Sequence, residues 1–357
     1  MRKLLLLSAL FATAANAQDI GARTSPQFVR YTLGAPSNNT ISEMAIPLYA
    51  VMPMTQMITF DIGTAFASAK LTNSNGGQGS SSSISGLTDT QLRAIINLGG
   101  DAVVLTGSVN LPTGQSTVKP AEQAAAGLIG NDFLVFPISS LGSGFGGTGG
   151  VAFARPMGDW SVGAGVSVRR TTAYSPYEDS TGKSLRFAPG NETRARIGFD
   201  HPFGTGRASI GFTYSKLGND QLVTSIYNTG DRLLSQAMLS SAAGSGDYTL
   251  SAWNLFRMSG TQVDGSASSR ELITDVSAAY GHPVGEGRLE PVVDVRTWMQ
   301  QGFAASFQTS LSLRFEQPMG ALTVAPSAGF TIGKLAADAT QTSSLSGFRA
   351  ALTIRTH

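Results

Sequence analysis

The histidines are the residues of this chain whose possible chemistry is easiest to name. Asp200 directly precedes His201, and an acid beside a histidine could orient a general base for a serine nucleophile. His201 and His282 each stand before a proline and a glycine, in "FDHPFGTG" and "YGHPVGEG", which is the composition of a tight turn. Their strands would lie about four strands, roughly 19 Å, apart, so the two rings could not share a metal ion. We therefore expect turn residues here, with no catalytic residue, no metal site and no cofactor, and we expect the protein not to be an enzyme.

A larger set of charged residues falls on the polar faces of segments that alternate between apolar and polar side chains. Many are arginines, whose planar guanidinium suits pairing with carboxylates in a half-buried site. Two interpretations fit: ion pairs that brace the wall of a lumen, which we favour because the charges roughly cancel, or a polar track that selects solutes by charge. The predicted pore-lining residues are Asp61, Arg93, Arg169, Arg194, Arg196, Asp275, Asp294, Arg296, Arg314 and Glu316, and the same faces carry Asp200, Glu290 and Arg349.

Alternation with a period of two predicts the strands that must position these charges. Between residues 307 and 316, one face reads Phe, Thr, Leu, Leu, Phe and the other reads Gln, Ser, Ser, Arg, Glu. Residues 57–68, 160–169 and 322–332 repeat the pattern, and each apolar face is about as long as the 9 to 11 residues that a tilted strand needs to cross the hydrocarbon. A soluble β-sandwich would also alternate. However, only 6 of the 25 basic residues are lysines, and the polar faces carry small residues rather than the cover of a solvated sheet.

A recurring unit marks the ends of hairpins: an aromatic residue, two variable residues, a proline, an apolar residue and a glycine, as in "FARPMGDW" and "FEQPMGAL". Proline cannot donate to a sheet ladder and glycine accepts a positive φ, so each unit predicts a strand end and a tight turn. Tight turns are expected near 53–56, 99–101, 157–159, 203–206, 243–247, 284–287 and 318–320, and longer loops near 35–41, 71–86, 112–146, 175–189, 218–229, 260–268, 300–303 and 335–343.

This regular alternation of short turns and longer loops predicts the fold class. We expect an all-β, transmembrane, antiparallel up-and-down β-barrel of about 16 strands, with 14 as the alternative, and with the short turns in the periplasm. The aromatic residues of the repeated unit stand where an interfacial girdle would lie: Phe153, Phe199, Tyr280 and Phe315.

The start of the chain has the features of a signal peptide. Residues 1–17 combine a basic start, an apolar run too short to span a bilayer and an Ala-Asn-Ala end. Residues 18–357 are expected to form a single outer-membrane barrel domain with a long loop at 112–146. The sequence has no cysteine, which suits export through an oxidising periplasm to the outer membrane of a Gram-negative-type cell. With 25 basic and 23 acidic residues, the chain gives no support for nucleic-acid binding.

The stretch "SGLTDTQLRAIINLGGDAVVLTGSVNLPTGQ", residues 85–115, carries a resemblance to a known family. A Gly-x-x-Asp start at Gly86 and Asp89, an alternating strand, a short turn and a Leu-Pro-Thr-Gly end at Leu111 resemble outer-membrane barrels associated with meta-pathway phenol degradation. Those barrels are themselves similar to long-chain fatty-acid transporters. The resemblance implies passage of apolar or aromatic small molecules. From the residues, we expect Asp89 to cap the strand start and Pro112 to end the pairing.

The loop at 112–146 is longer than a simple connection in a compact domain, so we expect it to have a structural or functional role. In "KPAEQAAAGLIG", Pro120 suits a first helical turn, Glu122 suits the positive helix end and Gly130 can stop the helix. The following apolar residues should not stay in water. We expect a short helix and an apolar strand that pack in the barrel mouth as a constriction formed by Phe133, Leu134, Phe136 and Ile138. Capping of the rim, or contact between barrels, is the alternative.

These features predict an outer-membrane channel or facilitator for small, apolar or aromatic molecules. The alternative is a closed barrel with a structural or surface-interaction role and no transport. Expected partners are outer-membrane lipid, a small apolar substrate and the barrel-assembly machinery. The low-complexity stretch at 74–86 is expected to be a solvated loop.

Overall fold

The chain folds as a closed antiparallel β-barrel. The structure, a computed structural model, describes residues 20–73, 80–100 and 102–356. One sheet contains 18 strands, and it closes because β22 pairs with both β1 and β2. The segments β1 and β2 follow one another in one position of the wall, as do β5 and β6, so the 18 segments form 18 − 2 = 16 wall strands. The predicted strand number and fold class are confirmed.

The wall contains β1 (Gly21–Thr24), β2 (Gln27–Leu33), β3 (Asn39–Pro53), β4 (Ile58–Asn73), β5 (Ser80–Leu87), β6 (Thr90–Leu98), β7 (Val103–Leu111), β8 (Gly146–Met157), β9 (Trp160–Thr171), β12 (Glu192–Phe203), β13 (Gly206–Leu217), β16 (Arg232–Ala243), β17 (Gly246–Arg257), β18 (Glu271–Val284), β19 (Gly287–Gln300), β20 (Ser306–Met319), β21 (Leu322–Ala336) and β22 (Thr342–Thr356). Outside it lie α2 (Gln123–Ile129), β10 (Tyr174–Glu178), β11 (Ser184–Ala188), β14 (Asp220–Leu222) and β15 (Ser225–Tyr227).

The side chains alternate across the wall as the sequence predicts. On β20, Leu311 is 60% exposed on the outer surface, while Gln308 is 1% exposed on the inner one. On β21, Phe330 and Ile332 lie on the outer surface and Thr331 between them is buried inside. A closed barrel leaves no free sheet edge in lipid, and an apolar outer surface matches the hydrocarbon. The chain is therefore an outer-membrane barrel of the Gram-negative type. Among the described helices, none is long and apolar enough to cross a membrane.

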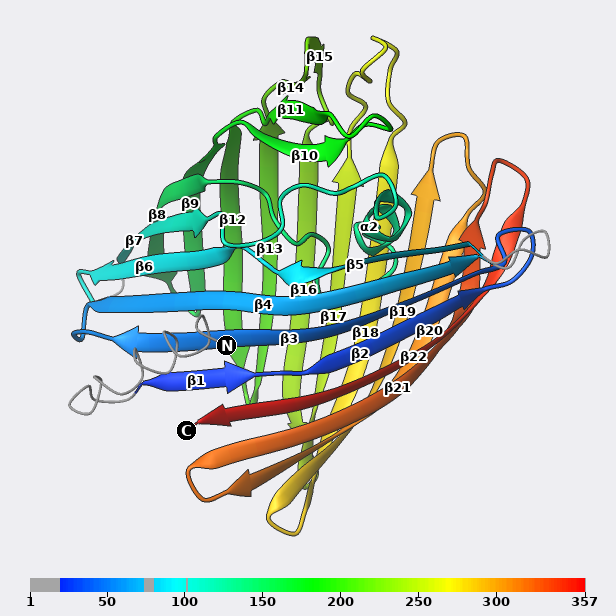
Figure 1. The fold of residues 1–357 in the computed structure, drawn as a ribbon. Helices are drawn as coiled ribbons and strands as arrows, with labels where there is room; N and C mark the ends of the chain where they lie inside the picture. Colours follow the sequence, from blue (N-terminus) through cyan, green and yellow to red (C-terminus); the bar gives the residue numbers. More distant parts are fainter. Residues whose placement is uncertain (1–19, 74–79, 101, 357) are drawn as a thin grey trace.

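The two ends of the barrel differ. Short turns join the strands at one end, called the turn end here, and longer connections join them at the other, called the loop end (Figure 1). Short turns face the periplasm in bacterial barrels, so the turn end is expected there. Above the loop end, β10, β11, β14 and β15 form a separate four-stranded sheet.

Three predicted loops contain strands. The regions 175–189 and 218–229 form this four-stranded sheet, because their polar backbone pairs with itself above the wall. The predicted solvated loop at 74–86 is also wrong from residue 80 onward. There β5 pairs with β4 and turns Ser82 and Ile84 into the barrel. Residues 74–79 lie outside the described residues, as does the predicted signal peptide.

The wall is lower beside β5 than elsewhere. The strand β4 pairs with β6 near the turn end and with β5 near the loop end. Only β6 continues the ladder to β7, so the second edge of β5 has no strand partner among the described residues. An unpaired edge must be covered or solvated. The long loop that follows β7 lies along this edge and inside the mouth (Figure 1).

The direction of each side chain can be tested on β20. Leu311→Arg puts a cation into the lipid-facing row and should reduce the free energy of unfolding by about 2 to 4 kcal/mol. The matched variant Ser310→Arg places the same side chain in the lumen, where Ser310 now bonds to Thr331, and should cost much less. Urea titration of the barrel refolded in lipid vesicles measures both. Equal losses would mean that the faces of β20 are reversed.

Candidate functional site

The side chain of Asp89 holds the two ends of the long loop together. Its Oδ1 accepts the backbone N–H of Gly114 at 3.1 Å, and its Oδ2 accepts the N–H of Ser143 at 2.7 Å and the side-chain amide of Asn110 at 2.8 Å. Gly114 passes so close that a Cβ would overlap the carbonyl oxygen of Leu141. The expected cap is thus a clasp across the base of the loop, and the Gly-x-x-Asp and Leu-Pro-Thr-Gly segments meet in it.

The predicted helix in the loop exists and docks on the low part of the wall. The hydroxyl of Ser82, on β5, donates to the carbonyl oxygen of Ala121 at 2.6 Å and accepts the N–H of Ala125 at 3.2 Å. Glu122 accepts the N–H of Lys119 at 2.9 Å, which stabilises the start of the helix. Gly130 ends it, with its N–H bonded to the carbonyl oxygen of Ala126. The helix α2 thereby packs against the inner face of β5.

The predicted apolar strand after the helix is wrong. Residues 131–138 form no sheet, because the side chain of Asn131 turns the chain by accepting the N–H groups of Phe133 and Leu134 at 2.9 and 3.3 Å. The backbone carbonyl oxygens of this segment then accept hydrogen bonds from side chains of the wall and not from a neighbouring strand. Gln308 donates to Phe133 at 2.9 Å, and Arg349 donates to Val135 at 3.0 Å.

The apolar side chains of this segment pack against the inner wall. Phe133 and Leu134 are completely buried, and Phe133 stacks on Trp298 with ring centroids 5.9 Å apart. Phe136 meets the ring of Tyr31 edge to face at 5.4 Å, and Ile138 packs against the same core cluster. We call residues 112–145 the plug. Its four predicted constriction residues are at the inner wall, and their effect on permeation stays a prediction.

Charged groups surround residues 131–138, which we call the tip of the plug. Arg257 contacts Asp132 and Glu271, each at 2.9 Å, and Arg296 pairs with Asp275 at 2.7 Å. Glu43 is fully buried. Its Oε1 accepts the N–H of Ile138 at 2.9 Å, while its Oε2 finds no hydrogen-bond partner among the described residues. The alternation of β3 is consistent with an inward Glu43, but the apolar residues and prolines around it make this alternation hard to recognise in the sequence.

On the side of the barrel opposite the plug, the lumen contains a cavity. A chamber of about 960 Å³ lies against the inner faces of β8, β9, β12, β13, β16 and β17. Its wall is thin because glycines lie side by side across three strands: Gly163, Gly198 and Gly211. Trp253 closes one side, with the guanidinium of Arg296 4.9 Å from its ring centroid.

Most of the predicted pore-lining charges form pairs within the wall. Arg93 pairs with Asp61 and with the hydroxyl of Tyr49, and Arg194 pairs with Glu192 at 2.7 Å. Asp294 lies close enough to Asp275, Arg296 and Arg349 to interact with all three charges. Arg169 and Arg196 have no ion pair or hydrogen bond to any described residue. All ten predicted positions are on inner faces by strand register, while a role in the pore stays a prediction.

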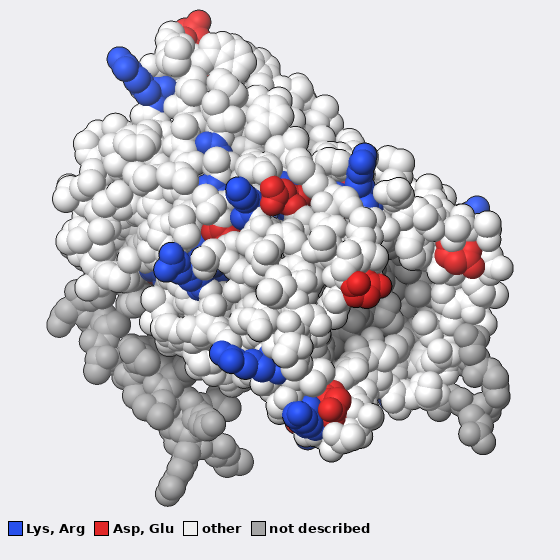
Figure 2. Space-filling model, turned by 90° about the horizontal axis from the view of Figure 1, so that it is seen from above, with Lys and Arg blue, Asp and Glu red and all other residues white. Residues whose placement is uncertain are grey.

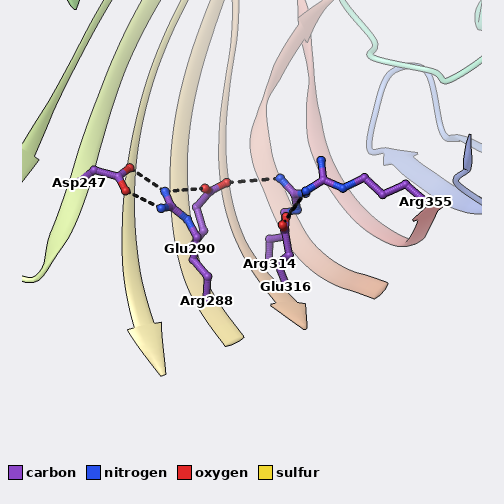
Figure 3. A network of polar contacts seen from close by, with 6 residues as sticks. All are labelled: Asp247, Arg288, Glu290, Arg314, Glu316 and Arg355. Carbon is purple, nitrogen blue, oxygen red and sulfur yellow. Dashed lines mark hydrogen bonds and ion pairs between the residues drawn. The ribbon is translucent and has the colours of Figure 1, made fainter. Parts of the chain in front are cut away.

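A six-membered charge ladder braces the inner wall near the turn end (Figure 3). Its three arginines alternate with three acids across β17, β19, β20 and β22, in the order Asp247, Arg288, Glu290, Arg314, Glu316 and Arg355. Three members of the ladder were not predicted from the sequence to face the lumen: Asp247, Arg288 and Arg355. Asp247 and Arg288 sit beside tight turns, where the inward face is hard to assign.

The ladder passes over two strands that contribute no charge to it. The guanidinium of Arg288 lies across β18 at Gly281, where any Cβ would overlap it. Arg355 reaches from β22 to Glu316 on β20 past Thr323 of β21. Because Gly281 and Thr323 are small, Arg288 can reach across β18, and Arg355 can reach across β21, to an acid two strands away.

His201 and His282 lie apart near the turn end. His201 stacks on Trp160 with ring centroids 4.6 Å apart, and its Nδ1 is 3.1 Å from the carbonyl oxygen of Asp159. His282 stacks on Tyr280 and contacts Ser245. Asp200 pairs with Arg207 and not with His201. Both histidines are paired near the end of a strand, just before a tight turn, and not in the turn itself.

The charged residues are sparse on the loop end as well. Seen from above the view of Figure 1, basic and acidic side chains lie scattered among uncharged ones, and near the middle of this face several of both signs lie close together (Figure 2). The visible surface therefore offers no continuous field of one sign above the mouth.

No family model matches the chain, and neither does any curated protein. Among solved structures, the chain is similar to the outer-membrane protein OmpT of Vibrio cholerae, with 10% identity, a TM-score of 0.42, and 96% of this chain and 99% of that chain covered. It is also similar to an outer-membrane channel from Pseudomonas putida F1, with 12% identity, a TM-score of 0.39, and 95% and 96% covered. The channel CymD, described as a monoaromatic hydrocarbon channel, gives 9% identity, a TM-score of 0.44, and 95% and 88% covered. These similarities concern the barrel fold.

The clasp can be tested by removing its acceptor. Asp89→Ala removes the acceptor of the hydrogen bonds from Asn110, Gly114 and Ser143, each worth about 1.5 to 3 kcal/mol, so the plug should become accessible to protease. Limited proteolysis of the folded barrel, with cleavage mapped within residues 112–145, measures this. Asp338→Ala is the matched control. Hydrogen bonds from Thr340 and Gln341 hold the pKa of that carboxyl below its ordinary value, but they cap only a local turn. Equal resistance of the Asp89 variant and the parent would contradict the clasp.

Proposed function

We propose that the protein is an outer-membrane channel for small molecules, with the plug as its constriction. The observation that supports the proposal most is the chamber of about 960 Å³. A barrel of 16 strands has more interior than its own side chains fill. Here the plug occupies the side lined by β2 to β5 and β19 to β22, whereas the side lined by β8, β9, β12, β13, β16 and β17 carries glycine, alanine and serine and holds the chamber.

The substrates are small molecules with an apolar body, aromatic ones included. The chamber is lined largely by uncharged side chains, among them Val104, Leu234, Met238 and Trp253. Apolar lining with a few placed polar groups is the usual composition of a small-molecule site. The resemblance of residues 85–115 to barrels of phenol-degrading pathways agrees with this class of substrate.

A closed barrel without transport is the second candidate. The contacts of the plug favour it, because they anchor both its base and its tip to the wall: Asp89 and Ser82 at the base, and Glu43, Gln308 and Arg349 at the tip. A plug held so firmly could close the lumen permanently.

Deletion of residues 121–141 separates the two candidates. The deletion removes α2 and the buried tip, and the channel proposal predicts a larger single-channel conductance in planar bilayers and faster passage of small solutes. Heat-modifiable migration in detergent gels verifies that the deletion variant is folded. A matched deletion of residues 262–266, the tip of a loop-end hairpin closed by Gln262 and Ser266, should leave the conductance unchanged. A folded variant lacking 121–141 with unchanged permeability would rule out the plug as the constriction.

A further inference from the structure

The chamber holds one charge that the wall does not neutralise. Two of its lining residues are charged, Arg196 and Asp200. Asp200 accepts the Nε–H of Arg207 at 2.6 Å, so that pair is neutral. Arg196 is exposed in the lumen, and no described residue forms a hydrogen bond or ion pair with it. The chamber therefore carries a single free guanidinium.

The register of β12 explains why Arg196 is free. The residues directly opposite it are Gly165 on β9 and Thr213 on β13, neither of which is charged. The inward acids of its own strand, Glu192 and Asp200, lie four residues away in either direction, about 13 Å along the strand. Each is already paired with a different arginine. The neighbouring glycines leave space in front of the guanidinium.

Arg169 of β9 also lacks an ion pair to any described residue, but it is not among the residues that line the chamber, and the charge that lies over Trp253 is balanced. Arg296, which lies over Trp253, pairs with Asp275 at 2.7 Å. The remaining face of the chamber is formed by uncharged side chains such as Gln236, Met238 and Leu234. A solute inside would thus meet apolar surface, one tryptophan ring and one unopposed cation. In a site with low-dielectric walls, such a cation attracts anions more strongly than it would in water.

We propose that the chamber selects small organic monoanions, in which an apolar body lies against the wall and one carboxylate binds Arg196. A guanidinium offers two parallel N–H donors that match the two oxygens of a carboxylate. The apolar lining disfavours hydrated inorganic ions by comparison. For transport this inference rests on the proposed channel function, but binding to Arg196 can be measured whether or not the barrel conducts.

Binding is tested on the folded full-length barrel in detergent with benzoate as the probe and benzyl alcohol as its uncharged analogue. Titration calorimetry should show that Arg196→Gln weakens benzoate binding about tenfold or more, the effect of losing one charge-assisted contact, and leaves benzyl alcohol unchanged. Arg196→Lys should restore part of the affinity. Arg170→Gln removes the same charge from the outer face of β9 and should have no effect. Benzoate that does not bind, or binds equally to the parent and Arg196→Gln, would overturn the site.

Selectivity is tested by the reversal potential of single channels across a potassium chloride gradient. The parent should prefer chloride to potassium, and Arg196→Gln should shift the reversal potential toward zero, while Arg170→Gln should not. A conducting channel whose ion preference is independent of Arg196 would overturn the selection and leave the channel function standing. A silent parent barrel that still binds benzoate through Arg196 would instead refute the channel function and support the site. Migration in detergent gels verifies the fold of every variant.

Discussion

Three residues donate hydrogen bonds to the carboxylate of Asp89, and through them the two ends of the plug are held together. Gly114 and Ser143 lie at opposite ends of the loop, so the carboxylate brings together two chain segments that the sequence keeps far apart. The clasp lies at the junction between β5 and β6, next to the edge of β5 that has no strand partner among the described residues. A charged acceptor at this point satisfies backbone groups that a regular ladder would otherwise have paired. The clasp thus fixes the points at which the chain enters and leaves the plug, and the helix and the apolar tip lie between these points.

The interior is asymmetric because its two sides use different side chains. On the plug side, long residues such as Trp298, Gln308 and Arg349 reach inward and hold the carbonyl oxygens of the tip. On the chamber side, glycine rows keep the wall thin and leave space around Arg196, which has no ion pair or hydrogen bond to any described residue. Near the turn end, arginines and acids alternate over the small residues Gly281 and Thr323. Buried charges are costly unless paired, so this ladder stabilises the wall while adding no net charge.

The sequence predicted the wall well and the interior only in part. Strand alternation and hairpin prolines reflect local constraints, which is why the strand number, the outward face of Leu311 and the helix ending at Gly130 are confirmed. The serine-rich β5 lacks that alternation, and only its pairing with β4 defines it as a strand. The tip of the plug was taken for a strand because its composition is apolar. Its conformation depends on Asn131 and on partners such as Gln308, more than 170 residues away in the chain, which no local pattern reveals.

The tip of the plug also lies across the seam where the barrel closes. Residues 133–138 contact β20 through Gln308, the last strand through Arg349, the first strand through Tyr31 and β3 through Glu43. The seam between β2 and β22 is thus joined twice, by its own ladder on the wall and by this segment from within. During assembly the tip can find its full set of partners only after the first and last strands have met. Any movement that withdraws the tip must also release this inner bridge, so opening of the mouth and loosening of the seam are mechanically linked.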